Sequence, residues 1–214
     1  MLACPDKGVS ITESLDITYY LLRFYPDLSP FHISGEIRKL LDELHRINYF
    51  SLTYTRRPDR ASAMLNAVEE RLADPTISER YRNALKYKRE VWVGLLSHYM
   101  IRNADSSWRV CETRAPALDA VFVGKEENKA LAFLSQIATT LHRSAHRGTP
   151  WLFGTVVPTA LDAHTVTFLA RLIDVGRGDM IESTVRQYAD SIFKKNIWTD
   201  TMQDRQTVHH AYRA

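Results

Sequence analysis

The sequence is poor in several residue types on which whole classes of protein depend. Two cysteines among 214 residues, Cys4 and Cys111, give neither a disulfide framework nor the ligand spacing of a zinc site. Eight glycines and eight prolines are too few for a low-complexity tract, and no internal repeat is present. No apolar run approaches the roughly 20 residues that span a bilayer, and the first residues lack the apolar segment of a signal peptide. We therefore expect a globular protein of the reducing cytoplasm, without a membrane partner.

Charge and motifs exclude further classes of function. The net charge of +3 and the isoelectric point near 8.8 reflect a mild basic excess, and the basic residues are scattered among acidic ones. This distribution argues against a nucleic-acid partner. The sequence contains no phosphate-binding loop, no glycine-rich dinucleotide motif and no recognisable Ser-His-Asp pattern.

Residues 148–180 form the strongest pattern in the chain. Thr159 and Asp162 have the spacing of a capping box, in which each side chain bonds the backbone N–H of the other residue. The residues that follow are apolar on nearly every side as far as Arg171, so we expect a buried helix that ends at Gly176 and Gly178. By itself, this pattern indicates a well-capped core helix and no chemistry.

The amino-terminal residues predict a β-hairpin followed by a helix. Two short extended pieces, 1–4 and 9–11, flank Pro-Asp-Lys-Gly, and a helix then runs toward Pro26. Considered alone, Thr12 or Ser14 is best interpreted as the cap of that helix.

After a linker at 27–31, the rest of the chain has helical periodicity, which predicts a mainly α protein. Helices are expected at 32–54, 60–73, 78–102, 126–146 and 181–195, in addition to the buried helix. A polar, then mixed connection is expected at 103–124. The tail at 198–214 is polar, and we expect it to fray or to lie along the surface.

Histidines were considered as metal ligands because eight are present. His142 and His146 lie four residues apart on a predicted helix, as two ligands can. Their surroundings are basic and polar, which favours a solvated helix end, and the tail pair His209-His210 suits only adventitious binding. No metal site is predicted.

Two stretches resemble soluble glutathione transferases. Trp151-Leu152-Phe153-Gly154, the capping box and Arg171 resemble the start and the end of that family's sixth helix. The hairpin, then Thr12-Glu13-Ser14, then Tyr25-Pro26 resemble the end of its thioredoxin-like domain. Across residues 9–30 and 148–195 the resemblance is to the group found among fungal specialised-metabolite pathways. It implies a partial thioredoxin-like, glutathione-binding domain at 1–27 (a β-hairpin plus a helix) and an all-helical glutathione-transferase C-terminal domain at 32–214.

The resemblance also implies a site. Glu13 and Ser14 match the pair that grips the γ-glutamyl end of glutathione, whereas Thr159 and Asp162 have a structural capping role. By position, the second substrate would lie against one face of the helix expected at 32–54, formed by His45, Asn48, Tyr49 and Leu52. For those four residues, an interpretation as core and surface positions stays open.

The segment that carries the family's catalytic Ser, Tyr or Cys has no counterpart in the sequence, so no thiol-activating residue is assigned. A shortened gene model, a genuine loss of the half-domain and pairing with another chain all stay open as explanations. The resemblance implies a homodimer that uses glutathione on a conjugated, electrophilic small molecule, by conjugation or by cis–trans isomerisation. The alternative hypothesis is a catalytically inactive binding or dimerisation module.

Overall fold

The computed structural model describes residues 2–4, 9–11, 13–56, 58–95, 99–102, 108–111, 119–203, 205 and 207. Over these residues the chain is mainly helical. It divides into two compact units: unit 1 is Met1–Ile47, Ala130–Ala170 and Asp179–Asp204, and unit 2 is Asn48–Lys129, Arg171–Gly178 and Arg205–Ala214. The predicted domain boundary near residues 27–32 stays a prediction.

Unit 1 begins with the expected hairpin and helix. Strand β1 (Leu2–Cys4) pairs antiparallel with β2 (Val9–Ile11), and Leu2 lies opposite Ile11. Helix α1 (Ser14–Leu21) follows, and two 3₁₀ turns, η2 (Pro26–Leu28) and η3 (Phe31–Ile33), occupy the predicted linker. The assignment of the hairpin and α1 to a thioredoxin-like fold stays a prediction.

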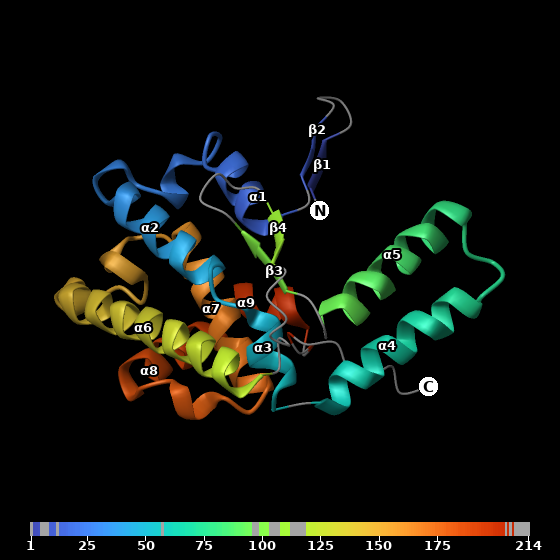
Figure 1. Ribbon diagram of the computed structural model, residues 1–214. Coiled ribbons are helices and arrows are strands. Elements are labelled where there is room, and N and C mark those ends of the chain that lie inside the picture. The colour runs from blue at the N-terminus through green and yellow to red at the C-terminus, as the bar shows by residue number, and fades with distance from the viewer. Residues whose placement is uncertain are drawn as a thin grey trace. The chain divides into compact units, whose positions relative to one another are not determined.

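The core of unit 1 is built by helices that pack side by side (Figure 1). They are α2 (Ser34–His45), the later part of α6 (Ala120–Ser144), most of α7 (Ala160–Asp174), and α8 (Ser183–Phe193). Phe133 of α6 meets Phe168 of α7 edge to face, with ring centroids 5.9 Å apart. Fully buried side chains of this core include Ile37, Leu41, Leu44, Ile137, Leu161, Leu169 and Val185. The apolar residues that recur at helical spacing in the sequence therefore form the core of this unit.

Short elements complete unit 1. They are α9 (Asn196–Met202) and the 3₁₀ turns η4 (Ala145–Arg147), η5 (Leu152–Gly154) and η6 (Gly178–Met180). The first residue of η6, Gly178, is counted in unit 2. In η5, Phe153 and Gly154 both have positive φ, 59° and 64°. A non-glycine residue rarely takes this conformation, so the tight turn before α7 is held by its surroundings.

Unit 2 contains α3 (Tyr49–Tyr54), α4 (Pro58–Ala73), α5 (Glu79–Leu95) and the antiparallel strands β3 (Tyr99–Arg102) and β4 (Trp108–Cys111). Helices α4 and α5 run antiparallel (Figure 1). Asp74 stabilises the turn that connects them, because it accepts hydrogen bonds from the backbone N–H and the hydroxyl of Thr76 at 2.9 and 2.6 Å. Arg82 donates to the carbonyl oxygens of Leu72 and Asp74.

The expected continuous helix at 32–54 is wrong. The chain leaves the helix after His45 and starts α3 at Tyr49. Asn48 caps α3, because its side-chain oxygen accepts from the backbone N–H of Ser51 at 3.2 Å. No proline or glycine marks the break. The apolar residues keep a helical spacing through it, and the prediction therefore extended one helix over both segments.

Three other boundaries also differ. The helix expected to reach residue 102 ends at Leu95, and 99–102 form β3 instead. The connection expected at 103–124 contains β4 and the start of α6 at Ala120. Trp198, expected in the tail, lies in α9, while Thr207 donates its backbone N–H and its hydroxyl to Asp174 at 2.7 and 2.6 Å.

Candidate functional site

Glu13 and Ser14 lie at the start of α1, and their side chains take no part in capping it. Glu13 is the N-cap residue, with φ −86° and ψ 133°, and its side chain makes no capping hydrogen bond. Ser14 is the first helical residue, so the interpretation of its side chain as the cap is wrong, and Thr12 lies outside the described residues. Both side chains are exposed, and within the described part of the chain neither is occupied by a hydrogen bond. A carboxylate and a hydroxyl are thus presented beside the N–H groups of a helix start.

A chain of hydrogen bonds connects the first turn of α1 to α7 and α2. Thr18 donates its hydroxyl to the carbonyl oxygen of Ser14 at 2.9 Å, and its Oγ1 lies 2.7 Å from Nε2 of His164. Nδ1 of His164 lies 3.1 Å from Nε2 of His45, with the rings edge to face. All three side chains of this relay, Thr18, His164 and His45, are partly buried in unit 1.

The bonding pattern assigns the protons of the neutral pair. The Thr18 hydroxyl has one proton and gives it to Ser14, so Oγ1 accepts from Nε2–H of His164. Nδ1 of neutral His164 is then an acceptor, and Nε2–H of His45 donates to it. Burial lowers the pKa of His164 from its ordinary value of 6.5, which favours this neutral form.

Both hydrogen bonds of the capping box are present at the start of α7. The backbone N–H of Thr159 donates to Oδ2 of Asp162 at 2.8 Å, and the N–H of Asp162 donates to the Thr159 hydroxyl oxygen at 3.4 Å. The same carboxylate accepts from the backbone N–H of Leu152 and from the Tyr188 hydroxyl, both at 2.8 Å. Burial raises the pKa of Asp162, and these hydrogen bonds oppose the rise. These groups therefore have a structural role, and none of them indicates a catalytic or binding role.

The four residues expected to line a substrate pocket do not share one helix. His45 ends α2 in unit 1, whereas Asn48 precedes α3 in unit 2. The argument from a single helix face is therefore wrong, and the pocket role of these residues stays a prediction.

Within unit 2, Asn48, Tyr49 and Leu52 are held by their surroundings. Asn48 is 7% exposed, and its backbone N–H donates to Oε2 of the buried Glu126 at 2.8 Å. Tyr49 lies under Arg171, with the guanidinium 5.8 Å from the ring centroid, and burial raises the pKa of its phenol. Leu52 is 2% exposed. The core interpretation fits Leu52, but Asn48 is not the surface residue that the same interpretation supposed.

No motif in the sequence singled out Thr18 or His164. The one available signal was a histidine two residues after Asp162 on a largely apolar helix, where burial without a partner is unfavourable. Of the histidines that were considered, His142 is exposed in the last turn of α6, and His146 lies beyond it in η4. No group of three or more potential metal ligands occurs among the described residues, and His209-His210 lie outside them.

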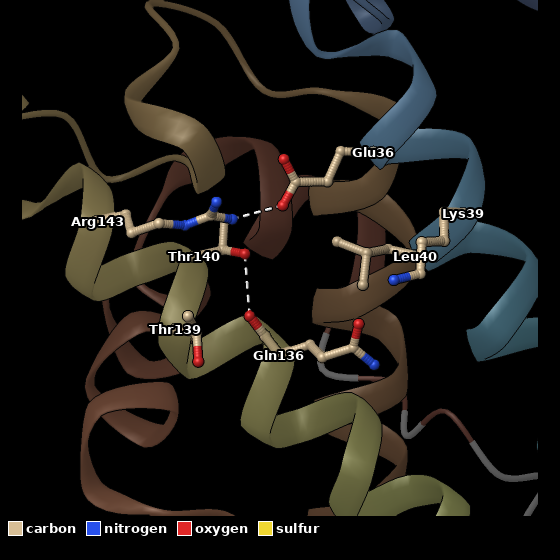
Figure 2. A pocket seen from close by; sticks show the side chains of 7 residues that line it. All are labelled: Glu36, Lys39, Leu40, Gln136, Thr139, Thr140 and Arg143. Atoms are coloured by element: carbon tan, nitrogen blue, oxygen red, sulfur yellow. Dashed lines mark hydrogen bonds and ion pairs between the residues drawn. The ribbon is translucent and has the colours of Figure 1, made fainter.

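Unit 1 also has a shallow groove between α2 and α6 (Figure 2). Its volume is about 200 Å³, below the range of roughly 300–1,000 Å³ typical of ligand pockets. Figure 2 shows the Arg143 guanidinium and the Glu36 carboxylate directed at each other across it, and they form an ion pair. Its lining residues are Glu36, Lys39, Leu40, Gln136, Thr139, Thr140 and Arg143. The groove is smaller than a typical ligand pocket and an ion pair spans it, so we do not assign the substrate to it.

Among the described helices, none combines the length and the apolar character needed to cross a membrane. No protein-family model matches the chain, and neither a curated protein nor a solved structure matches it significantly.

Proposed function

We propose that this chain binds glutathione at the start of α1 and uses it as a glutathione-transferase-like enzyme. The observation that carries the proposal is the free state of the Glu13 and Ser14 side chains, which are exposed at a helix start that does not use them as caps. Glu13 supplies a carboxylate for the γ-glutamyl ammonium group. Ser14 and the N–H groups at the start of α1 supply donors for the neighbouring carboxylate.

The finer fold assignment is part of the same proposal. In it, the hairpin and α1 belong to a thioredoxin-like domain, and the helices after residue 32 form an all-helical glutathione-transferase C-terminal domain. The capping box supports it, because Thr159 and Asp162 are bonded at the start of a buried helix, as the resemblance implies. The homodimeric state and the cytoplasmic location belong to the proposal on the same basis.

The reaction follows from the chemistry of a bound thiolate. The sulfur lone pair adds to an electrophilic, conjugated alkene, a carbon–sulfur bond forms, and the π electrons move onto the conjugated system. Protonation of carbon then yields the glutathione conjugate. The former carbon–carbon double bond is a single bond in this adduct and can rotate. If it rotates before protonation and the thiolate then leaves, the alkene forms again with the opposite geometry, which is cis–trans isomerisation.

Isothermal titration of the 214-residue protein with reduced glutathione tests the site. Removal of a carboxylate that pairs with an ammonium group should weaken binding by roughly tenfold or more, so we expect that loss in Glu13→Ala. The chain contains a matched control, because Glu182 is likewise an exposed N-cap residue without a capping bond, followed by Ser183 at the start of α8. Glu182→Ala should leave the affinity unchanged.

Equal losses in the two variants, or no binding by the folded wild-type chain, would contradict the proposed site. Binding without turnover of any conjugated alkene would leave the site in place and favour the inactive binding or dimerisation module. The titration therefore tests the binding claim, and a turnover assay with conjugated alkenes tests the catalytic one.

A further inference from the structure

Arg171, in the last turn of α7, has a guanidinium group that is only partly used. Its Nε donates to the hydroxyl oxygen of Thr53 at 3.0 Å, and its guanidinium carbon lies 5.8 Å from the centroid of the Tyr49 ring. Within the described part of the chain, Nη1 and Nη2 make no hydrogen bond or ion pair. Both nitrogen atoms carry N–H donors, so this edge of the group has donors without acceptors. All three residues belong to unit 2.

Two other arginines with little exposure show the contrast. The Nη1 of Arg177 pairs with the Glu127 carboxylate, and Nη2 of Arg82 donates to the Asp74 carbonyl oxygen at 2.8 Å. Burial lowers the pKa of Arg171, because a cation that loses contact with water is unfavourable unless an anion compensates it. Among the described residues, no carboxylate forms an ion pair with Arg171 to provide that compensation.

The titratable groups around Arg171 do not neutralise it by contact. Burial raises the pKa of the Tyr49 phenol, so this ring is neutral near pH 7. Asp174, the last residue of α7, accepts the backbone N–H and the hydroxyl of Thr207 at its Oδ2 atom and acts on Arg171 only through space. A second cation, Arg56, donates to the Gly176 carbonyl oxygen at 2.7 Å. The end of α7 therefore has positive charge for which an anion is a suitable partner.

We propose that Arg171 binds the carboxylate of a flat, conjugated organic acid through Nη1 and Nη2. These two nitrogen atoms lie in one plane and match the two oxygen atoms of a carboxylate. Arg171 is partly exposed, and neither Nη atom is among the buried polar atoms without a partner, so both are accessible from solvent. The Tyr49 ring and the Phe50–Tyr54 ring pair, with centroids 4.8 Å apart, give the site an aromatic neighbourhood for a flat ligand. The site needs no glutathione, and the proposal does not rest on the proposed function.

The charges favour a carboxylate over a phosphate. A phosphate monoester carries about −1.5 to −2 charges at pH 7, whereas a carboxylate carries one. The single guanidinium group of Arg171 balances one negative charge, and the Asp174 carboxylate repels any further charge. A monoanion is therefore the better match.

Titration calorimetry of the wild-type chain, without glutathione, tests the site with three probes of similar shape. Cinnamate has the carboxylate, cinnamamide has the same flat body without the charge, and phenyl phosphate has a dianion. We expect cinnamate to bind saturably with one molecule per chain and cinnamamide to bind at least tenfold more weakly, because charge-assisted hydrogen bonds are lost. Phenyl phosphate should bind more weakly than cinnamate, and added salt should weaken cinnamate binding.

Arg171→Gln removes the charge and retains an amide that can donate to Thr53. We expect it to bind cinnamate about tenfold more weakly or less tightly still, with no change in its weak affinity for cinnamamide. Arg186→Gln is the matched control, because Arg186 lies on α8 in unit 1 and pairs with Asp190. It should bind cinnamate as the wild-type chain does.

The wild-type comparison decides the proposal even if Arg171→Gln does not fold. Equal affinities for cinnamate and cinnamamide, or no binding of cinnamate by the folded chain, would overturn it. Unchanged cinnamate affinity in folded Arg171→Gln would also overturn it, and tighter binding of phenyl phosphate would overturn the choice of a carboxylate. Because glutathione is absent from these titrations, none of these results bears on the site at Glu13 and Ser14.

Discussion

The Tyr188 hydroxyl donates a 2.8 Å hydrogen bond to Oδ1 of Asp162, so α8 is joined to the first turn of α7 by a buried polar contact. Tyr188 is 5% exposed and Asp162 is 1% exposed. Asp162 therefore serves as more than a helix cap. Its carboxylate accepts from the turn before α7, from the residue that directly precedes α7 and from α8.

Removal of the Asp162 carboxylate should be far more damaging than removal of the Tyr188 hydroxyl. Asp162→Ala leaves buried donors of Leu152, Thr159 and Tyr188 without an acceptor, so we expect a loss of about 3–5 kcal/mol in the free energy of unfolding. Tyr188→Phe removes one charge-assisted bond and should cost about 1.5–3 kcal/mol. Urea denaturation measures both values, and equal losses would contradict the central role of Asp162.

The pH dependence of stability should report the buried state of His164. Burial lowers its folded pKa below 6.5, so as the pH falls through 6.5 the unfolded chain takes up a proton that folded His164 does not. This contribution to stability is present above pH 6.5 and is lost toward the folded pKa, at up to about 1.4 kcal/mol per pH unit. Urea denaturation of His164→Gln over the same pH range should show a correspondingly smaller loss. Equal slopes in the wild-type protein and in His164→Gln would contradict the prediction.

Gly154 should tolerate a side chain less well than Gly148, although both have similar positive φ values of 64° and 66°. A Cβ atom at Gly154 would lie 2.3 Å from Cδ and 2.8 Å from Cβ of Arg147, whereas nothing lies within 4 Å of one at Gly148. Gly148→Ala should therefore cost only the left-handed conformation, about 1–2 kcal/mol. Gly154→Ala should cost more by thermal or urea denaturation, and equal costs would show that Arg147 moves aside freely.

Arg177 should not be replaceable by lysine. Its side chain is 1% exposed, and its Nε donates to the Leu52 carbonyl oxygen at 2.6 Å while Nη1 pairs with Glu127. A lysine ammonium group cannot reproduce this forked arrangement, so we expect Arg177→Lys to lose about 2 kcal/mol of stability. Arg186→Lys is the matched control, because Arg186 forms an exposed pair with Asp190 and should change stability by less than about 0.5 kcal/mol. Similar values for the two variants would contradict the prediction.

Features that depend on residues close together in the sequence could be predicted from the sequence. The hairpin of β1 and β2, the box at Thr159 and Asp162, and the apolar helices were all recognisable from residue types and spacing. The break before Asn48 was not, because it depends on Glu126, which is 78 residues away and bonds the Asn48 backbone. The pairing of β3 with β4 was missed as well, since the predicted helix was extended through Arg102.

The candidate site was predictable only in part, for the same reason. Glu13 and Ser14 form a short motif next to a helix start, so the sequence alone was enough to select them. The contact between His45 and His164 joins residues 119 apart, and that between Thr18 and His164 joins residues 146 apart. Contacts between residues so far apart in the sequence follow from no spacing pattern. The three side chains come together only in the folded chain.

The hydrogen bonds of Asp162 also bear on the order in which the chain folds. Their donors lie only 10, 3 and 26 residues away, so each bond closes a short loop and costs little chain entropy. Residues 152–188 can therefore acquire this set of bonds while the contacts that join distant parts of the sequence are still unformed. The His45–His164 contact closes a much longer loop, so we expect it to form after the hydrogen bonds of Asp162.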